Sequence, residues 1–253
     1  MLATEDLTIR FGGHAAVDSV SCAFQPGTLT SIVGPNGAGK TTYFNLISGQ
    51  LPATSGKVRL NGEDITGYAA PRRTRLGLGR AFQLTNLFPN LSALENVRLA
   101  VQVKSGKGLD LFSRTQTHRE LIDQAMTHLA AVSLADRAPA VAATLPHGDQ
   151  RKLEVAILLA LEPDIFMFDE PTAGMSVDEV PTILDIIANI KQRGDKTILL
   201  VEHKMDVVRS LSDRIVVLHQ GKLVADGKPA EVINSDIVRE AYLGGAAPGD
   251  GHG

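Results

Sequence analysis

A glycine-rich segment at residues 34–41, Gly-Pro-Asn-Gly-Ala-Gly-Lys-Thr, constrains this chain more than any other part of its sequence. Its glycines let consecutive backbone N–H groups converge on phosphate oxygens at the N-terminus of a helix. The β-type run at 29–33 before it predicts a strand, and the pattern that follows, up to Gly49, predicts a helix. This strand–loop–helix order favours a phosphate-binding loop over an ordinary tight turn.

The polar residues that end this loop have separate chemical tasks in such a site. Lys40 can meet the β- and γ-phosphates as a point charge, the Thr41 hydroxyl can ligate Mg²⁺, and Thr42 can donate to an adjacent phosphate oxygen. We therefore predict a nucleotide site made of Gly34, Asn36, Gly37, Gly39, Lys40, Thr41 and Thr42.

Two adjacent carboxylates, Asp169 and Glu170, follow the apolar run at 165–168. Ligands of open α/β sheets bind at the carboxyl ends of the strands, where this pair would lie. In-line phosphoryl transfer needs an oriented nucleophile more than covalent chemistry. We expect Asp169 to hold Mg²⁺ and Glu170 to polarise the attacking water; the alternative is an acidic turn at the surface.

The pattern of the remaining sequence predicts an α/β fold. Apolar runs at 165–168 and 197–201 flank a helical pattern at 176–193, and this order implies a parallel sheet covered on both faces. A mainly helical stretch includes Ser92 and Glu95 at capping-box spacing, a connection at 104–110 and a helix at 113–132. Antiparallel strands are expected at 7–11, 20–24, 58–60, 214–219 and 222–225, with turns at Asn61-Gly62 and Gln220-Gly221.

Composition excludes several other classes of protein. The chain has 253 residues, with 25 Lys+Arg against 28 Asp+Glu, which suits neither a nucleic-acid-coating protein nor a disordered acidic one. Its longest apolar run, 155–161, is far shorter than the roughly 20 residues of a membrane-spanning helix. The lone Cys22 is expected to be a buried strand residue in a reducing compartment, and the N-terminal segment lacks the features of a secretory signal.

Three further residues occur in a fixed order with these motifs. They are Phe11, Gln83 within Arg-Ala-Phe-Gln, and His203 within Val-Glu-His. Each alone also suits an ordinary structural residue, so the order is the argument. From residue 7 to about 244 the chain resembles the ATP-binding subunits of ATP-binding cassette (ABC) transporters. The resemblance implies that Phe11 stacks on adenine, that Gln83 serves Mg²⁺ and catalysis, and that His203 is a catalytic switch histidine.

The resemblance also implies a P-loop NTPase (ABC ATPase) core with an antiparallel β lobe and a helical subdomain inserted at about residues 84–160. One ATP-binding domain then covers residues 1–243, and the glycine-rich tail at 244–253 is expected to be disordered. The stretch 84–96 would form the groove for a membrane subunit's coupling helix. Leu87, Phe88 and Leu91 would line this groove, with core packing as the alternative.

The family's signature segment, commonly Leu-Ser-Gly-Gly-Gln, opens a helix and acts in trans on the ATP of a partner subunit. The matching residues here, Pro146, His147, Gly148 and Asp149, depart from it. Pro146 removes a hydroxyl and a backbone N–H, and Asp149 brings a carboxylate that would compete with the partner's γ-phosphate. Alternatively, Asp149 points away and only caps the helix. Ser176 also stands where the family usually has Asp.

Short matches at 11–13, 80–83, 173–175, 201–203 and 242–244 resemble one subgroup, the importers of branched-chain and other hydrophobic amino acids. Such importers pair two different ATP-binding subunits, two membrane permease subunits and an external solute-binding protein, with the ATPase on the cytoplasmic face of the membrane. Alternatives within the family are a urea or amide importer and a lipid or polysaccharide exporter.

Other classes lack support in the sequence. A soluble ABC-type ATPase of DNA repair would carry long heptad insertions, a GTPase would show Asn-Lys-x-Asp, and neither occurs. No nucleic-acid partner is expected. The arginines at 72, 73, 75 and 80 are predicted to form a solvated helical face, with contact to lipid or a membrane subunit as the alternative.

Overall fold

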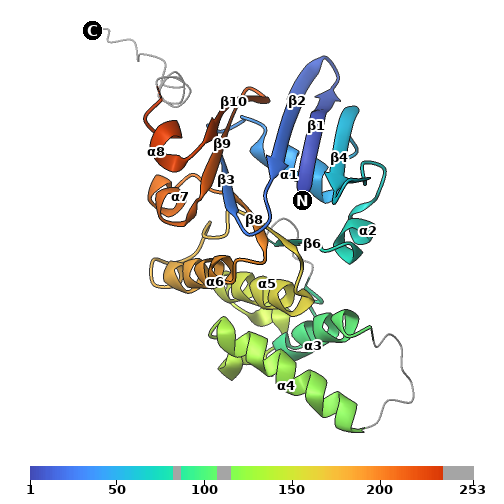
Figure 1. Ribbon diagram of the computed structural model, residues 1–253. Coiled ribbons are helices and arrows are strands. Elements are labelled where there is room, and N and C mark those ends of the chain that lie inside the picture. The colour runs from blue at the N-terminus through green and yellow to red at the C-terminus, as the bar shows by residue number, and fades with distance from the viewer. Residues whose placement is uncertain (82–86, 107–114, 236–253) are drawn as a thin grey trace. The chain divides into compact units, whose positions relative to one another are not determined.

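The computed structural model describes residues 1–81, 87–106 and 115–235 (Figure 1). The chain divides into two units, the first made of Met1–Leu76 with Gly194–Gly253 and the second of Gly77–Arg193. Part of the predicted connection at 104–110 lies outside the described residues. The whole of the tail predicted to be disordered, 244–253, also lies outside them. The two units are described one after the other.

An antiparallel sheet forms one part of the first unit. Its order is β2-β1-β4-β5, made of β2 (His14–Phe24), β1 (Leu2–Phe11), β4 (Ser55–Leu60) and β5 (Glu63–Asp64). Asn61 and Gly62 both have positive φ, 52° and 87°, which confirms the predicted turn. Cys22 is buried in β2 as expected, and burial raises the pKa of its thiol to about 11.

A second group of strands in this unit contains the strand before the glycine-rich loop. β3 (Leu29–Val33) pairs in parallel with β8 (Thr197–Val201) and with β9 (Arg214–His219), and β10 (Lys222–Gly227) pairs antiparallel with β9. Every residue of β3 and β8 is buried. The parallel arrangement expected for the run at 197–201 is confirmed by the pairing of β8 with β3, whereas the parallel pairing of β9 with β3 was not predicted.

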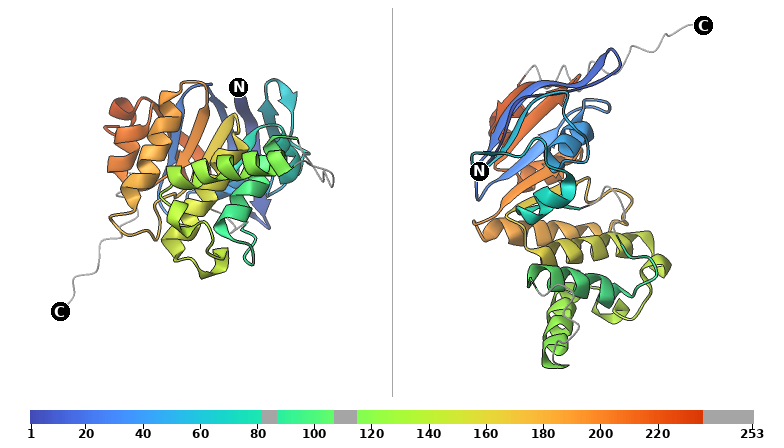
Figure 2. Two further views of the ribbon diagram at one scale, coloured as in Figure 1. Left: turned by 90° about the horizontal axis from the view of Figure 1, so that it is seen from below. Right: turned by 90° about the vertical axis from the view of Figure 1, so that its right-hand side faces the viewer.

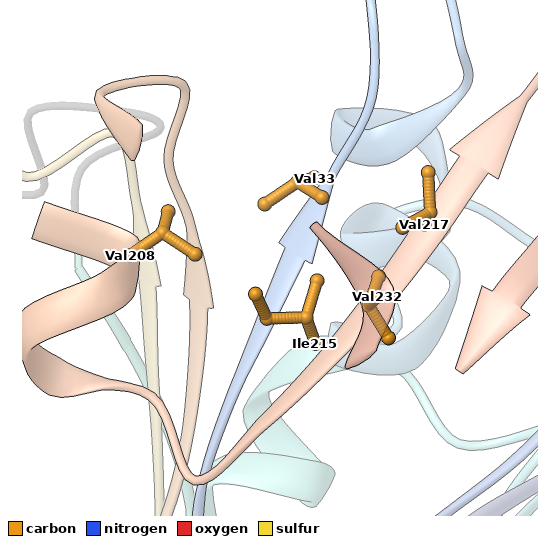
Figure 3. Packing of buried hydrophobic residues seen from close by; sticks show 5 residues of the cluster. All are labelled: Val33, Val208, Ile215, Val217 and Val232. Atoms are coloured by element: carbon orange, nitrogen blue, oxygen red, sulfur yellow. The ribbon is translucent and has the colours of Figure 1, made fainter. Parts of the chain in front are cut away.

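Three helices accompany these strands, α1 (Lys40–Ser48), α7 (Met205–Leu211) and α8 (Pro229–Val232). Val208 of α7 and Val232 of α8 belong to one buried cluster with Val33, Ile215 and Val217 (Figure 3). The predicted end of α1 is confirmed, since Gly49 caps it in the left-handed conformation with a φ of 79°.

The second unit combines two parallel strands with helices. β6 (Leu78–Ala81) pairs with β7 (Ile165–Asp169), and α3 (Ala93–Lys104), α4 (Thr115–Ala131) and α5 (His147–Leu161) pack against one another (Figure 2). Short 3₁₀ turns lie at Ala135–Arg137 and Ala142–Thr144. The predicted helical insertion at about 84–160 falls within this unit. None of the helices among the described residues is long and apolar enough to cross a membrane.

Two helix starts test the capping predictions. At α3 the prediction is confirmed, because the Ser92 side chain accepts a hydrogen bond from the backbone of Glu95 at 3.1 Å. The helix predicted from Ser176 is wrong at its start, since α6 is Val180–Gln192. Ser176 and Glu179 do bond to each other, but Pro181 lacks an N–H and suits only the first turn of a helix, so the regular helix begins beside it.

The prediction of a solvated arginine face is confirmed for Arg72 and Arg75, which are exposed, and is wrong for Arg73. Within α2 (Ala70–Arg75), Arg73 is 2% exposed and donates to the backbone oxygens of Leu46, Ile47, Thr66 and Tyr68 at 2.7–2.8 Å. The last carbonyls of a helix have no partner within it, and Arg73 supplies one at the end of α1. Burial lowers the pKa of Arg73 to about 10. Arg73 therefore fixes the far end of the helix that the glycine-rich loop begins.

Arg73→Met is expected to lower the free energy of unfolding by about 2–4 kcal/mol, because buried carbonyls lose a charged donor. Urea unfolding measures this. Arg72→Met is the matched control, since Arg72 is exposed and only stacks on the Tyr68 ring. Equal unfolding midpoints for the two variants would show that the Arg73 contacts contribute nothing to stability.

Candidate nucleotide site

The phosphate loop joins β3 to α1 within the first unit. Gly34, Gly37 and Gly39 have positive φ of 151°, 78° and 96°. A Cβ on Gly34 would meet the Leu218 oxygen and one on Gly39 the Ala16 oxygen, so neither position accepts a side chain. Nothing lies near a Cβ built on Gly37. The backbone thus holds the curved conformation that directs N–H groups to one point.

Lys40 is the first residue of α1 and lies within the loop that precedes it. Its ammonium donates to the oxygens of Gly34 and Pro35 at 2.7 and 3.0 Å, and the residue is 7% exposed. Helix α1, described in full, has no side-chain cap and no acidic residue in its first turn. A helix N-terminus with this composition favours an anion, so the loop fits a phosphate group. Thr41 and Thr42 follow Lys40 in the same turn.

The other two candidates of the first unit are exposed. Phe11 ends β1 and is 54% exposed. His203 follows β8, and the buried carboxylate of Glu202 accepts the backbone N–H groups of His203 and Lys204 at 2.8 and 3.3 Å. Glu202 therefore fixes the backbone of the predicted switch histidine. The role of Glu202 could not be predicted from the sequence, because no residue pattern indicates that a side chain binds the backbone N–H groups next to it.

In the second unit, Asp169 ends β7 as predicted. Its Oδ2 lies 2.9 Å from a guanidinium nitrogen of Arg80 on the neighbouring strand β6, and both side chains are less than a tenth exposed. Burial lowers the pKa of Arg80, while the ion pair with Asp169 opposes this shift. Arg80 is therefore no part of a solvated face, and it orients the predicted metal-binding carboxylate.

Glu170 has an unusual backbone conformation. Its φ is 51°, a left-handed value that costs a non-glycine residue about 1–3 kcal/mol. The Ala173 N–H donates to the Glu170 oxygen at 3.1 Å and closes the turn. Backbone strain of this kind persists only where the surrounding structure holds it.

The departing signature segment opens α5, as predicted. Pro146 is the N-cap residue, Gly148 is buried, and Asp149 lies in the first turn. Gln150 closes the start of the helix, donating from its backbone to Pro146 and from its side chain to Leu145, both at 2.9 Å. The imidazole of His147 lies beside Gly174.

The Asp149 carboxylate pairs with Lys152 at 3.1 Å, and Lys152 also binds Glu179 at 2.8 Å. The Asp149 carboxylate is therefore paired within its own chain, while its competition with a partner's phosphate stays a prediction. Lys152 lies three positions after Asp149 on the helix, so the two side chains lie on one face.

The predicted residues thus fall into two sets. The phosphate loop, Phe11 and His203 belong to the first unit, and Asp169, Glu170 and the signature residues belong to the second. Gln83 lies outside the described residues. Phe88 and Leu91 are 55% and 36% exposed, so core packing is wrong for these two, and Leu87 is half-buried.

Comparison with known proteins identifies the family. Residues 17–173 match the family described as "ABC transporter", and residues 222–248 match "Branched-chain amino acid ATP-binding cassette transporter". The chain is similar to the "High-affinity branched-chain amino acid transport ATP-binding protein LivG" of Salmonella typhimurium, with 39% identity across 97% of this chain and 98% of the relative. It is 38% identical to BraF of Pseudomonas aeruginosa, covering 97% and 98% of the two chains.

Solved structures agree with this comparison. A nucleotide-free ATP-binding cassette from an ABC transporter aligns with a TM-score of 0.80 and 26% identity over 96% of this chain and 98% of that one. The ADP- and Pi-bound dimer of the cassette MJ0796 aligns with a TM-score of 0.78 and 26% identity over 90% and 99%. The chain therefore belongs to the ABC transporter family, as one of its ATP-binding proteins in the branched-chain amino acid group.

Proposed function

We propose that this chain is the ATP-hydrolysing subunit that energises an importer of branched-chain or other hydrophobic amino acids. The observation that carries the proposal is the similarity over nearly the whole chain to transport ATP-binding proteins named for branched-chain amino acids. The match of residues 222–248 to the branched-chain amino acid family favours this cargo over urea, amides, lipids or polysaccharides.

ATP would bind with its phosphates on the loop from Gly34 to Thr42 and its adenine on Phe11. Three features make this loop suitable for phosphates: the glycines with positive φ, the buried ammonium of Lys40 and the uncapped start of α1. Oxygen donors suit Mg²⁺, and we assign its binding to Thr41, Gln83 and Asp169. When bound, this ion would neutralise charge on the phosphate oxygens.

The residues of the chain would then divide the catalytic work. Glu170 would orient the attacking water and accept its proton, with its direction set by the strained backbone. His203, held by Glu202 through the backbone, would stabilise charge that develops on the γ-phosphate. Arg80 would keep the Asp169 carboxylate in position on β7.

A single ATP-binding domain at residues 1–243, with its helical subdomain at about 84–160, would work as part of a larger complex. Its partners would be a second ATP-binding subunit of different sequence, two permease subunits and, indirectly, a solute-binding protein. Exposed Phe88 and Leu91 suit docking to a permease at the cytoplasmic face of the membrane.

Purification of the tagged chain from detergent-extracted membranes of its own host tests this function. We expect a second ATP-binding chain and permease subunits to copurify, and leucine with its binding protein to stimulate ATP hydrolysis. Recovery of the chain alone, or stimulation by DNA in place of an amino acid, would reject the proposal.

We predict that the two ATP sites of the complex are unequal. One ATP site uses this chain's signature, and it lacks a hydroxyl donor because residue 146 is Pro. The other ATP site uses this chain's phosphate loop together with the partner's signature. Pro146→Ser combined with Asp149→Gln should raise the ATPase rate of the full transporter, and because Asp149 is already paired, most of the gain should come from position 146. An unchanged rate with equal nucleotide occlusion at both sites would refute the asymmetry.

A further inference from the structure

We propose that Lys152 is a positioning residue that holds the carboxylates of Asp149 and Glu179 together, so that the start of α5 can still face an anion. The inference rests on the proposed function, because only a signature used in trans meets the phosphates of a partner's ATP. It explains how the chain tolerates an acidic residue in its signature.

The geometry joins two segments that are far apart in the sequence. Lys152 Nζ lies 3.1 Å from Asp149 Oδ1 and 2.8 Å from Glu179 Oε1. The other oxygen of Glu179 accepts the backbone N–H and the hydroxyl of Ser176 at 3.2 and 3.0 Å. One ammonium therefore connects the first turn of the signature helix to the segment that follows Glu170.

Burial makes this contact stronger than a surface ion pair. The side chains of Lys152, Asp149 and Glu179 are 11%, 16% and 26% exposed. Burial alone would lower the pKa of Lys152, but its hydrogen bonds to Glu179 and Asp149 raise this pKa overall. The bond from Lys152 lowers the pKa of Glu179. The Glu179 carboxylate and the Lys152 ammonium thus favour each other's charged form.

The signature glycine fits the same arrangement. A Cβ on Gly148 would overlap both carboxylate oxygens of Glu179, so Gly148 allows this carboxylate to lie directly against the first turn of α5. Two carboxylates then lie at the end of a helix that would attract a phosphate. Without Lys152 they would occupy that end themselves and repel a partner's ATP.

Arg151, the nearest other cation on this helix, does not replace Lys152 in this arrangement. Its guanidinium lies 3.3 Å from the carboxylate of Glu154, which is buried one turn further along. Neutralisation of Asp149 therefore depends on Lys152 among the described contacts of this turn.

The test is a mutant cycle in the full transporter, with the KM for ATP and kcat measured separately. Lys152→Met should raise the KM about five- to tenfold, because an uncompensated carboxylate then faces the bound phosphates. Adding Asp149→Gln in the same chain should restore part of the wild-type KM, because Glu179 still lacks its cation, and Lys152→Arg should keep the wild-type KM. Lys152→Gln serves in place of Lys152→Met if the latter does not fold.

Three outcomes would overturn the inference. The first is an unchanged KM for ATP in Lys152→Met. The second is a KM that rises equally in Lys152→Met with and without Asp149→Gln. The third is a Lys152→Met variant whose only change is a lower thermal unfolding midpoint. The last two would mean that Lys152 has only a structural role. Failure of the proposed function is distinguishable, since the wild-type complex would then show no amino-acid-stimulated ATPase at all.

Discussion

Glu170→Gln is expected to lower ATP turnover of the assembled complex by at least about 10²-fold while leaving ATP binding intact. A glutamine amide can neither accept the proton of the attacking water nor orient that water equally well. The side chain is similar in size, so the strained turn at Glu170 should persist. Phosphate release from the purified complex, together with titration of ATP binding, measures both effects.

Asp178→Asn is the matched control for this variant. Asp178 is an exposed carboxylate in the same segment, and the same chemical change there should leave turnover near the wild-type value. The Glu170 variant should also accumulate the closed, ATP-bound pair of subunits. If Glu170→Gln hydrolyses ATP like the wild type, the role assigned to Glu170 is wrong.

Lys40→Ala is expected to weaken ATP binding by about 2–4 kcal/mol, or roughly 30- to 700-fold in Kd. The buried ammonium lies inside the loop, where a charged donor contributes more than it would in water. Isothermal titration calorimetry of the full chain with Mg-ATP measures the change in affinity. Lys57→Ala removes an exposed lysine of β4 and should bind ATP as the wild type does.

If Lys40→Ala binds ATP with wild-type affinity, the assignment of phosphate binding to this loop is wrong. A matched loss in both lysine variants would instead point to a general effect of net charge. The comparison separates the two effects, because Lys57 belongs to β4 and Lys40 to the start of α1 beside the loop.

Local patterns account for what could be predicted from the sequence. The bounds predicted for β3, β8 and β9 match the structure, because each is a short β-type run that the local sequence delimits. The Asn61-Gly62 turn and the cap at Ser92 follow from short-range stereochemistry. The phosphate loop and the Asp169-Glu170 pair were found through local motifs, whereas the roles of Phe11, Gln83, His203 and the signature residues were implied by the resemblance to the ABC family.

Contacts between distant residues account for most of what could not be predicted. Arg80 and Asp169 are 89 positions apart, and Arg73 reaches Leu46 across 27 positions. Neither pair leaves a periodic pattern, so both arginines read as surface residues. The pairing of Lys152 with Glu179 is of the same kind, since the two residues are 27 positions apart.

Uptake of radiolabelled leucine into proteoliposomes tests the central claim most directly. The vesicles would contain the copurified complex and enclosed Mg-ATP, with the solute-binding protein outside. The account predicts leucine accumulation that requires enclosed ATP and is abolished when this chain carries Glu170→Gln. Accumulation at the wild-type rate with Glu170→Gln, or without enclosed ATP, would contradict the claim that this chain energises the transport.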